Sequence, residues 1–343
     1  MLDYKKTGTF LASKRKQAQM TQADVAQKLG VSFQSVSKWE NGTLPFPEIP
    51  HPVLVLKSEE PGSKQKLAME YGYSESICHD MINHLVNDIM VMGARPLAVL
   101  DTIVCGSAEK ETIKSFIKGI SDACRENGCS LVGGETSIQP QVVEKGVYVL
   151  TSSIAGILSK DKVIDGSGIT EGDTVLAVAS NGLHTNGYSL VRMLMDQAPQ
   201  IKLEKIDGET FIEQIMKPHT TYRNAIRNLL ECPGIHGMAH ITGGGIQGNL
   251  CRILPDGLYA DIDLSKIKTL PIFRYIQRIG NIDEAEMLST FNCGVGLIVV
   301  VSERYAEQAI RNIAKYHDCY EIGRIRKGNG KVLFRNSVNW ESS

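Results

Sequence analysis

The stretch Leu85-Val-Asn-Asp-Ile-Met-Val-Met-Gly-Ala-Arg-Pro-Leu-Ala-Val-Leu-Asp101 decides how the rest of the chain is organised. Apolar residues recur at helical spacing before and within it: Met81, Ile82, Leu85, Ile89 and Met92. The pattern predicts a helix with one buried face that holds Asn87 and Asp88 on a rigid element. Gly93 ends this helix, and residues 97–100 predict a short buried strand that Asp101 closes. The alternative is that Asn87 and Asp88 are solvated and that Asp101 caps a turn.

The length and the net charge of the chain limit the classes of protein to which it can belong. The chain has 343 residues, enough for two or three domains, and its net charge of -1 excludes a body that binds nucleic acid by charge alone. Residues 1–43 hold seven Lys or Arg against three acids, a net of +4, which leaves -5 for the other 300 residues. The asymmetry suggests a basic appendage on an acidic body.

The compartment follows from what the sequence lacks. We expect a cytoplasmic protein with no membrane contact, because no apolar run is long enough to cross a bilayer and the N-terminus has no apolar signal-peptide core. The eight cysteines form no Cys-x-x-Cys pair, and Cys105 and Cys293 lie in apolar surroundings. They are typical of reduced core residues.

The N-terminal segment predicts a helix-turn-helix between residues 9 and 42. Thr21 and Asp24 form a capping-box-like helix start, Gly30 breaks that helix, and Ser32 caps a second helix that turns Val36 and Trp39 inward. The segment resembles the phage-repressor (Xre/Cro) type. The resemblance implies base contacts from the second helix and a supporting phosphate contact, through Phe33, Gln34, Lys38 and Gln22.

Two features count against DNA binding by this segment. Residues 43–52 contain four prolines and cannot continue as a regular helix, so the module is shorter than usual. A few positive charges give modest phosphate affinity, and binding would require a dimer that presents two copies. The alternative is a vestigial helical cap that docks on the body.

After the prolines, the sequence has the features of a strand and a phosphate-binding loop. Residues 52–56 predict the strand, and the polar stretch 57–64 follows, with Gly62 and Ser63 directly before Lys64. Backbone N–H groups and an ammonium can meet phosphate oxygens in such a loop. Ordinary loops share the pattern, so both interpretations stay open.

Glycine-rich loops then recur at the ends of predicted elements. Residues 129–136 predict a short strand that delivers Glu135 at its end, where ligands gather in α/β proteins. The loop 180–187 places His184 and Thr185 at a helix start that favours an anion, and the loop 240–245 repeats the arrangement with His240. The other predicted helices cover 108–125, 188–195, 246–253 and 306–314, and the other strands 146–158, 173–179 and 297–301, followed by two closing strands.

From Pro52 onward the chain resembles aminoimidazole ribonucleotide synthetase (phosphoribosylformylglycinamidine cyclo-ligase). The shared blocks are Val-Asn-Asp-Ile at 86–89, Gly-Ala-x-Pro-Leu at 93–97, Cys-Ser-Leu-Val-Gly-Gly-Glu-Thr at 129–136, His-Thr-Asn-Gly-Tyr-Ser-Leu-Val-Arg at 184–192, His-Ile-Thr-Gly-Gly-Gly at 240–245 and Thr-Phe-Asn-Cys-Gly-Val-Gly at 290–296. They occur in the family's order and at its spacing.

The resemblance implies an α/β (layered α+β) fold with two domains behind the small all-helical segment. The expected division is 1–45 for the helix-turn-helix, 46–166 for the N-terminal domain and 167–343 for the C-terminal domain, with a boundary within 164–173. The resemblance also implies a homodimer formed through the first domain's sheet, and ATP- and Mg²⁺-dependent ring closure of formylglycinamidine ribonucleotide.

The resemblance assigns roles to particular residues of this chain. Catalysis falls to His184, Asn186 and His240; nucleotide binding to Lys64, Asn87, Asp101, Gly133, Gly134 and Thr136; the substrate phosphate to Thr185, Thr242, Gly243 and Gly244; and the metal to Asp88, Glu135 and Glu59. Phosphoryl transfer demands such cationic groups and tight positioning.

Three departures from the family leave other functions open. The phosphate loop is more acidic and stiffer, because Glu59 and Glu60 replace an aspartate and a glycine and Pro61 removes a backbone donor. Ile138 and Gln141 replace an acid and a glycine, and the helix-turn-helix occupies the place of a glycine-rich lid. The alternatives are a transcription regulator that keeps an impaired body as a dimeric purine-nucleotide sensor, and a relative that acts on another ATP-activated substrate.

Overall fold

The computed structural model describes residues 4–29, 32–41, 49–329 and 331–341. The chain divides into two compact units. Residues 1–53 and 159–161 form the first unit, called the head below. Residues 54–158 and 162–343 form the second unit, called the body.

The head is a bundle of three helices, α1 (Tyr4–Gln17), α2 (Gln22–Leu29) and α3 (Phe33–Glu40). The predicted helix starts are confirmed, since the Asp24 backbone N–H donates to Thr21 Oγ1 (3.1 Å) and the Ser35 N–H donates to Ser32 Oγ (3.2 Å). Sequence patterns missed α1. Arg15 on that helix binds the Glu40 carboxylate through two nitrogens, at 2.5 and 2.8 Å, and so ties α1 to α3.

Three of the four side chains expected to face DNA are exposed on α3. Phe33 is 51% exposed, and Gln34 and Lys38 are exposed as well. Gln22 is instead held within the head, because its side-chain amide donates to Glu40 Oε2 (2.8 Å). The proline-containing linker expected over 43–52 lies largely outside the described residues.

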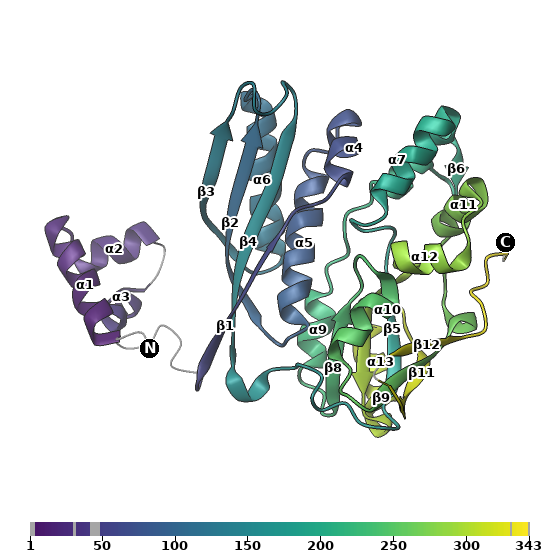
Figure 1. Cartoon of the computed structure of the whole chain (residues 1–343). Helices are drawn as coiled ribbons and strands as arrows, with labels where there is room; N and C mark the ends of the chain where they lie inside the picture. The colour runs from purple at the N-terminus through teal and green to yellow at the C-terminus, as the bar shows by residue number, and fades with distance from the viewer. Residues whose placement is uncertain (1–3, 30–31, 42–48, 330, 342–343) are drawn as a thin grey trace. The chain divides into compact units, whose positions relative to one another are not determined.

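The body contains two larger sheets, a two-stranded ribbon and the helices that pack on them (Figure 1). Its strands are β1 (Pro52–Glu59), β2 (Arg95–Cys105), β3 (Ser130–Ile138), β4 (Tyr148–Ser159), β5 (Thr174–Ala179), β6 (Lys205–Ile206), β7 (Glu209–Thr210), β8 (Ile235–His240), β9 (Leu258–Asp263), β10 (Val295–Val301), β11 (Cys319–Lys327) and β12 (Val332–Arg335), of which β1 and β4 reach the boundary with the head. Its helices are α4 (Lys64–Glu70), α5 (Ser76–Met90), α6 (Lys110–Glu126), α7 (Tyr188–Gln197), α8 (Phe211–Ile215), α9 (Arg223–Leu229), α10 (Gly245–Leu250), α11 (Pro271–Gly280), α12 (Glu284–Thr290) and α13 (Ala306–Ile313). Short 3₁₀ turns lie at Lys160–Lys162, Pro199–Leu203, Cys251–Ile253, Leu264–Lys266 and Glu303–Tyr305.

The first sheet has the strand order β1-β4-β2-β3, with β2 antiparallel to β4 and parallel to β3. Helices α5 and α6 contact each other and the strands β2 and β3. Alternate residues of β1 are exposed, and Leu56 is 73% exposed. Leu54, Leu100 and Val132 are exposed as well. One face of this sheet is therefore covered by helices, and the other presents apolar side chains.

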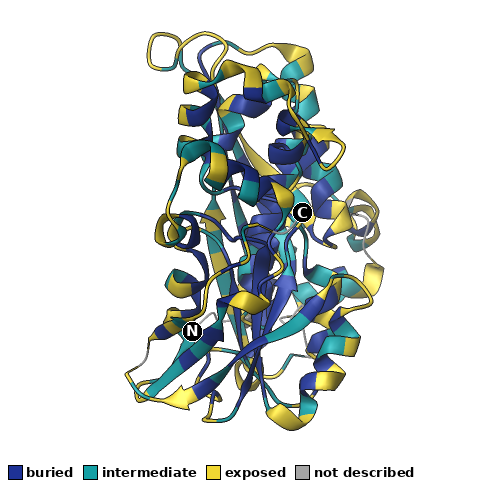
Figure 2. Ribbon diagram, turned by 90° about the vertical axis from the view of Figure 1, so that its right-hand side faces the viewer, coloured by how far each residue is buried: buried dark blue, intermediate teal, exposed yellow. Residues whose placement is uncertain are grey.

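The second sheet has the order β12-β9-β11-β5-β10-β8 and forms the larger core. Every residue of β10 is buried, which fits its all-apolar sequence and its place between β5 and β8. Helix α13 contacts β5 and β11, while α10 contacts β8 and β10. Figure 2 shows these strands largely buried, with exposed residues on the outer sides of the helices.

Two predicted strands and one predicted buried residue differ from the structure. Strands β2 and β3 are longer than predicted, so Asp101 and Glu135 lie within strands and not at strand ends. The predicted strand ended early because glycines and acids are rare in strands. The apolar spacing within the predicted helix 108–125 also led us to expect Ile117 in its buried stripe. Ile117 is 36% exposed, whereas Phe116, Ile120 and Cys124 are buried.

All eight cysteines are free thiols, and only Cys251 is exposed. Among the described residues, no helix combines the length and apolar character required to cross a membrane.

We predict that Gly245→Ala destabilises the body more than Gly208→Ala. Both glycines have positive φ, +59° and +85°, so alanine costs about 1–2 kcal/mol of backbone strain at either site. A Cβ at Gly245 would also lie 1.9 Å from the Leu288 carbonyl oxygen, whereas a Cβ at Gly208 meets nothing within 4 Å. Overpacking adds about 1–3 kcal/mol at Gly245 alone. Urea unfolding of the two variants measures the difference, and equal losses would contradict the prediction.

Candidate active site

A polar stripe on α5, formed by Asp80, Asn83 and Asn87, fixes the segment 217–222. Spacings of three and four residues place these side chains on one helix face. Asp80 accepts a hydrogen bond from the His219 backbone N–H (2.8 Å), and Asn83 donates to the His219 carbonyl (2.7 Å). Asn87 donates to the Thr220 carbonyl (2.8 Å) and accepts from the Tyr222 N–H (2.9 Å). Side chains of α5 thus satisfy the backbone of a buried loop.

Asn127 and Thr221 complete this polar stripe. Asn127 at the end of α6 donates to Asn83 Oδ1 (2.7 Å) and accepts from the Thr221 hydroxyl (2.6 Å). The stripe therefore joins the first half of the chain to the second.

Lys64 lies inside the protein and not at a phosphate site. Its ammonium donates to Asp80 Oδ1 (2.8 Å) and to the carbonyls of His184 (3.1 Å) and Lys217 (2.7 Å), and the residue has no exposed surface. Burial lowers the pKa of Lys64 and raises that of Asp80 to about 6, while their mutual attraction opposes both shifts. Since its three N–H groups are used internally, Lys64 cannot contact a phosphate in this structure, which corrects the sequence-based assignment.

Asn87 is placed in a similar way. Its side-chain amide is fully buried and binds the backbone of the segment 217–222.

Four imidazole rings meet beside the polar stripe, and together they form a histidine cluster. They come from α5 (His84), the loop before α7 (His184), the segment 217–222 (His219) and the end of β8 (His240). The rings of His184 and His219 stack at 3.9 Å, and His219 Nε2 lies 2.8 Å from His240 Nε2. Burial lowers the pKa of His184, His219 and His240, so these rings are neutral.

Asp88 connects this cluster to the surface. One carboxylate oxygen lies 2.6 Å from His240 Nδ1, and the other lies 3.5 Å from His84 Nε2 and 3.1 Å from Lys57 Nζ. Burial opposes ionisation, but hydrogen bonds from His240 and His84 outweigh it and lower the pKa of Asp88. Lys57 also lies 3.1 Å from Glu59, and these two carboxylates outweigh burial and raise its pKa.

These groups open into a pocket of about 500 Å³. Its polar lining residues are Lys57, Glu59, His84, Asp88, Asn186, His240, Thr242, Gly243, Asn249 and Arg252. The pocket unites the expected residues Glu59, Asp88, Asn186, His240, Thr242 and Gly243. His184 and Thr185 are buried behind it, where Thr185 Oγ1 lies 3.3 Å from His84 Nδ1. Gly244 is the N-cap of α10 and does not line the pocket.

The expected residues of the first sheet do not line this pocket. Gly133, Gly134, Glu135 and Thr136 are exposed on the edge strand β3. Asp101 is 5% exposed and packs over Gly134, where a Cβ would lie 2.1 Å from its Oδ1. Glu135 is therefore not brought to the pocket that Asp88 lines, and Gly134 is needed to leave room for Asp101.

Sequence reasoning missed His84, His219, Lys57 and Arg252. His84 had a usable signal, since it lies one helical turn before Asp88 and must share its face. The sequence contains no comparable signal for His219. The segment after Pro218 is irregular, and only its contacts with the polar stripe of α5 fix the position of His219.

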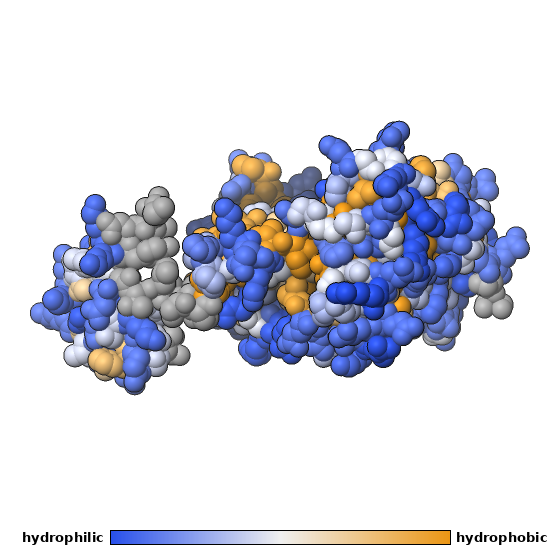
Figure 3. Space-filling view, turned by 90° about the horizontal axis from the view of Figure 1, so that it is seen from below, coloured by the Kyte–Doolittle hydropathy of each residue, from blue (hydrophilic) through white to orange (hydrophobic). Residues whose placement is uncertain are grey.

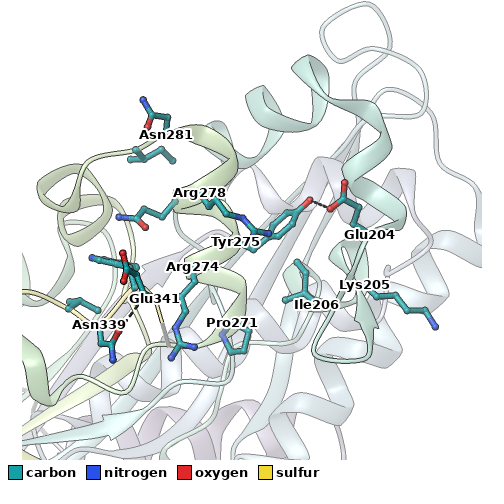
Figure 4. Close-up of a pocket in the computed structure, with 14 residues that line it drawn as sticks. Glu204, Lys205, Ile206, Pro271, Arg274, Tyr275, Arg278, Asn281, Asn339 and Glu341 are labelled. Atoms are coloured by element: carbon teal, nitrogen blue, oxygen red, sulfur yellow. Dashed lines mark hydrogen bonds between the residues drawn. The ribbon is translucent and has the colours of Figure 1, made fainter. Parts of the chain in front are cut away.

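A larger cavity, of about 1140 Å³, lies elsewhere in the body, between α11 and residues 338–341 (Figure 4). Arg274, Arg278 and Tyr275 point into it from α11, and the Tyr275 hydroxyl donates to Glu204 (2.6 Å). It contains none of the expected site residues, so the smaller pocket is the candidate active site.

The fold defines the class of protein. Residues 54–158 and 170–336 match the N- and C-terminal domains of the AIR synthase related proteins, and residues 11–47 match a helix-turn-helix. The body is similar to E. coli HypE, with a TM-score of 0.61 and 20% identity over 84% of this chain and 83% of that one. It is also similar to thiamine-monophosphate kinase from Stenotrophomonas maltophilia K279a, with a TM-score of 0.60 and 17% identity over 84% and 87%. At these identities the likeness shows the fold alone.

The sequence relatives define the family. The chain is 41% identical over 294 residues, 84% of each protein, to phosphoribosylformylglycinamidine cyclo-ligase of Bacillus cytotoxicus. It is 42% identical over 285 residues, 82% of each protein, to the cyclo-ligase of Methylobacillus flagellatus. The chain therefore belongs to the phosphoribosylformylglycinamidine cyclo-ligase family, and the resemblance noted in the sequence is confirmed.

We predict that Lys64→Met lowers the free energy of unfolding by about 3–5 kcal/mol, because it leaves the buried Asp80 without its cation. Adding Asp80→Asn removes that charge and recovers part of the loss. The matched control is Lys114→Met, which breaks an exposed ion pair with Glu111 and leaves stability nearly unchanged. Chemical denaturation measures all three, and a stable Lys64→Met protein would contradict the account of Lys64.

Proposed function

We propose that this protein closes the imidazole ring of formylglycinamidine ribonucleotide, with ATP, to give aminoimidazole ribonucleotide in cytoplasmic purine biosynthesis. The observation that carries the proposal is the extent of the relatedness, 41% identity over 84% of both chains, to a protein named for this activity. The pocket supports it, because cations, carboxylates and imidazoles converge there.

The reaction requires two steps that the pocket can serve. The γ-phosphoryl group of ATP passes to the formyl oxygen, and a substrate nitrogen then attacks that carbon, so that phosphate leaves and a proton is lost. Lys57 and Arg252 are the cations at the pocket, and we assign them the phosphate contacts first expected of Lys64. Asn186 and His240 line the pocket and would contact the substrate, while the buried His184 would act from behind them.

A divalent cation fits part of the expected ligand set. Glu59 and Asp88 present carboxylate oxygens, the donors that Mg²⁺ prefers, and Lys57 Nζ lies 3.1 Å from each. We propose that these two residues, without Glu135, hold Mg²⁺ once Lys57 turns toward the phosphates. The ion would neutralise charge on the transferring phosphoryl group.

We predict that Asp88→Asn lowers kcat/KM by about 100-fold, because His240 and Lys57 lose the charge that orients them. Lys57→Met should raise KM for ATP about tenfold. The control Asp122→Asn alters a partly exposed carboxylate on α6, outside the pocket, and keeps full activity. Formation of ADP and aminoimidazole ribonucleotide from ATP, Mg²⁺ and formylglycinamidine ribonucleotide is measured.

Failure of the wild-type protein to form product would overturn the proposal. Binding of ATP or substrate without turnover would favour the sensor alternative, and turnover of another amide or phosphate acceptor would favour a different substrate.

We propose a second function, DNA binding by the head, and a homodimer through the uncovered face of the first sheet. The exposed Phe33, Gln34 and Lys38 on α3 favour the former. Apolar side chains reach the surface of the body (Figure 3). The exposed Leu54, Leu56, Leu100 and Val132 on one sheet favour the dimer, since such a patch marks an interface.

We predict that Leu56→Glu converts the dimer to a monomer, because it places a charge within the apolar interface. Lys38→Ala should remain dimeric, keep turnover and bind a mixed-sequence duplex about tenfold more weakly at low salt. Sedimentation velocity and fluorescence anisotropy measure these outcomes. A dimeric Leu56→Glu protein would exclude this sheet face as the interface, and duplex binding unaffected by Lys38→Ala would exclude α3 as the reader.

A further inference from the structure

Two cysteines lie next to each other at the end of α6, and they are called the thiol pair below. Cys124 lies in the last turn of α6, and Cys129 directly precedes β3. The Cys129 thiol donates a hydrogen bond to the Cys124 carbonyl oxygen, with the sulfur 3.5 Å from that oxygen. Both residues are free thiols, and neither belongs to the polar stripe or lines the pocket. The proposed ring closure therefore makes no use of them.

The backbone at the end of α6 brings the thiol pair together. The Gly128 N–H donates to the Arg125 carbonyl (3.1 Å), and the Cys129 N–H donates to the Cys124 carbonyl (3.0 Å). Gly128 has a φ of +65°. These two bonds and the left-handed glycine form a Schellman motif, in which side chains at the positions of Cys124 and Cys129 commonly touch. A disulfide joins Cα atoms about 4.4–6.8 Å apart, and a direct backbone hydrogen bond between two residues holds them within that range.

The two thiols differ in exposure and in charge. Cys129 is 9% exposed, whereas Cys124 is 1% exposed. A hydrogen bond from the Cys124 thiol lowers the pKa of Cys129 against the effect of burial, and the Arg223 guanidinium lowers it further. A Cβ on Gly128 would lie 2.4 Å from Arg223 Nη2, so this cation packs directly against the turn. The contact with Cys129 raises the pKa of Cys124, and burial adds to this effect.

We propose that Cys124 and Cys129 are a redox modification site, at which a low-molecular-weight disulfide oxidises the pair to a reversible disulfide. The thiolate is the nucleophile in such an exchange, so Cys129 reacts first. Cys129 loses its proton and attacks one sulfur of the oxidant, a mixed disulfide forms, and one small thiolate leaves. Cys124 then loses its proton and attacks the Cys129 sulfur, which expels the second small thiolate. The two leaving thiolates take up the two protons, so two protein thiols are oxidised and one small disulfide is reduced.

The surroundings of the thiol pair allow this change without unfolding. Residues 124–129 enclose Asn127, whose side chain donates to Asn83 (2.7 Å) and accepts from Thr221 (2.6 Å). Because the Schellman hydrogen bonds already fix this turn, disulfide formation leaves Asn127 in place and the body folded. Disulfides in reducing compartments are usually transient and catalytic or redox-sensing, which fits a reversible site. The proposal concerns the thiol pair and does not rest on the proposed function.

The test treats the reduced, folded full chain with bis(2-hydroxyethyl) disulfide, blocks the remaining thiols and maps the products by peptide mass spectrometry. We expect a disulfide between Cys124 and Cys129 that dithiothreitol reverses and that forms at least about tenfold faster than adducts on the other buried cysteines. Circular dichroism before and after oxidation should be unchanged. The matched control Cys251→Ser removes the exposed cysteine and should form the same disulfide at the rate of the wild type.

Single variants of the thiol pair test the order of the two steps. In Cys124→Ser, the mixed disulfide at Cys129 should accumulate, because the second thiol that resolves it is missing. In Cys129→Ser, the buried Cys124 should stay unmodified. If either variant fails to fold, the wild-type and Cys251→Ser proteins still decide the outcome. Two unmodified thiols at 124 and 129 in the folded wild-type protein, or a disulfide that forms only after unfolding, would overturn the proposal.

Discussion

The structure depends on the hydrogen bonds between the polar stripe of α5 and the backbone of residues 217–222. Helix α5 is buried on nearly all sides, so Asp80, Asn83 and Asn87 would be costly there without partners. They find them in the N–H and carbonyl groups of His219, Thr220 and Tyr222. The segment in turn obtains the partners that an irregular buried loop lacks. This mutual satisfaction holds the two halves of the body together and sets the position of the histidine cluster.

Lys57 and Lys64, the two lysines of the predicted phosphate loop 57–64, show how burial decides which charged side chain can meet a ligand. Lys64 has the sequence context of a phosphate ligand, but its ammonium is enclosed by Asp80 and two carbonyl groups. Lys57, in a position with no motif of its own, reaches the pocket between Glu59 and Asp88. Charge at a site is therefore set by which side chain retains solvent contact. Glu59 and Asp88 hold the Lys57 ammonium between them in this structure, and they would hold Mg²⁺ there in the proposed complex.

Periodicity and glycine signals were sufficient to predict most elements of the body, including α5, α7 and β10, and the starts of α2 and α3 in the head. The family resemblance led us to expect Asp88, Asn186 and His240 at one site, and all three line the pocket. The local patterns failed for Asp101 and Glu135, whose strands continue past polar residues once neighbouring strands supply hydrogen bonds. They also failed for His219, because its place is set by contacts more than 130 residues away in sequence. Local sequence patterns give no information on contacts between residues so far apart in the chain.

The polar stripe contacts main-chain atoms of residues 219–222 and none of the side chains at His219 or Thr220. Every amino acid except proline offers the same amide and carbonyl groups, so these positions can change identity while the loop keeps its course. The course of the loop therefore does not depend on which side chains it carries at these positions. Proteins that share this fold can gain or lose an imidazole at the centre of the molecule while the backbone contacts of the loop stay the same.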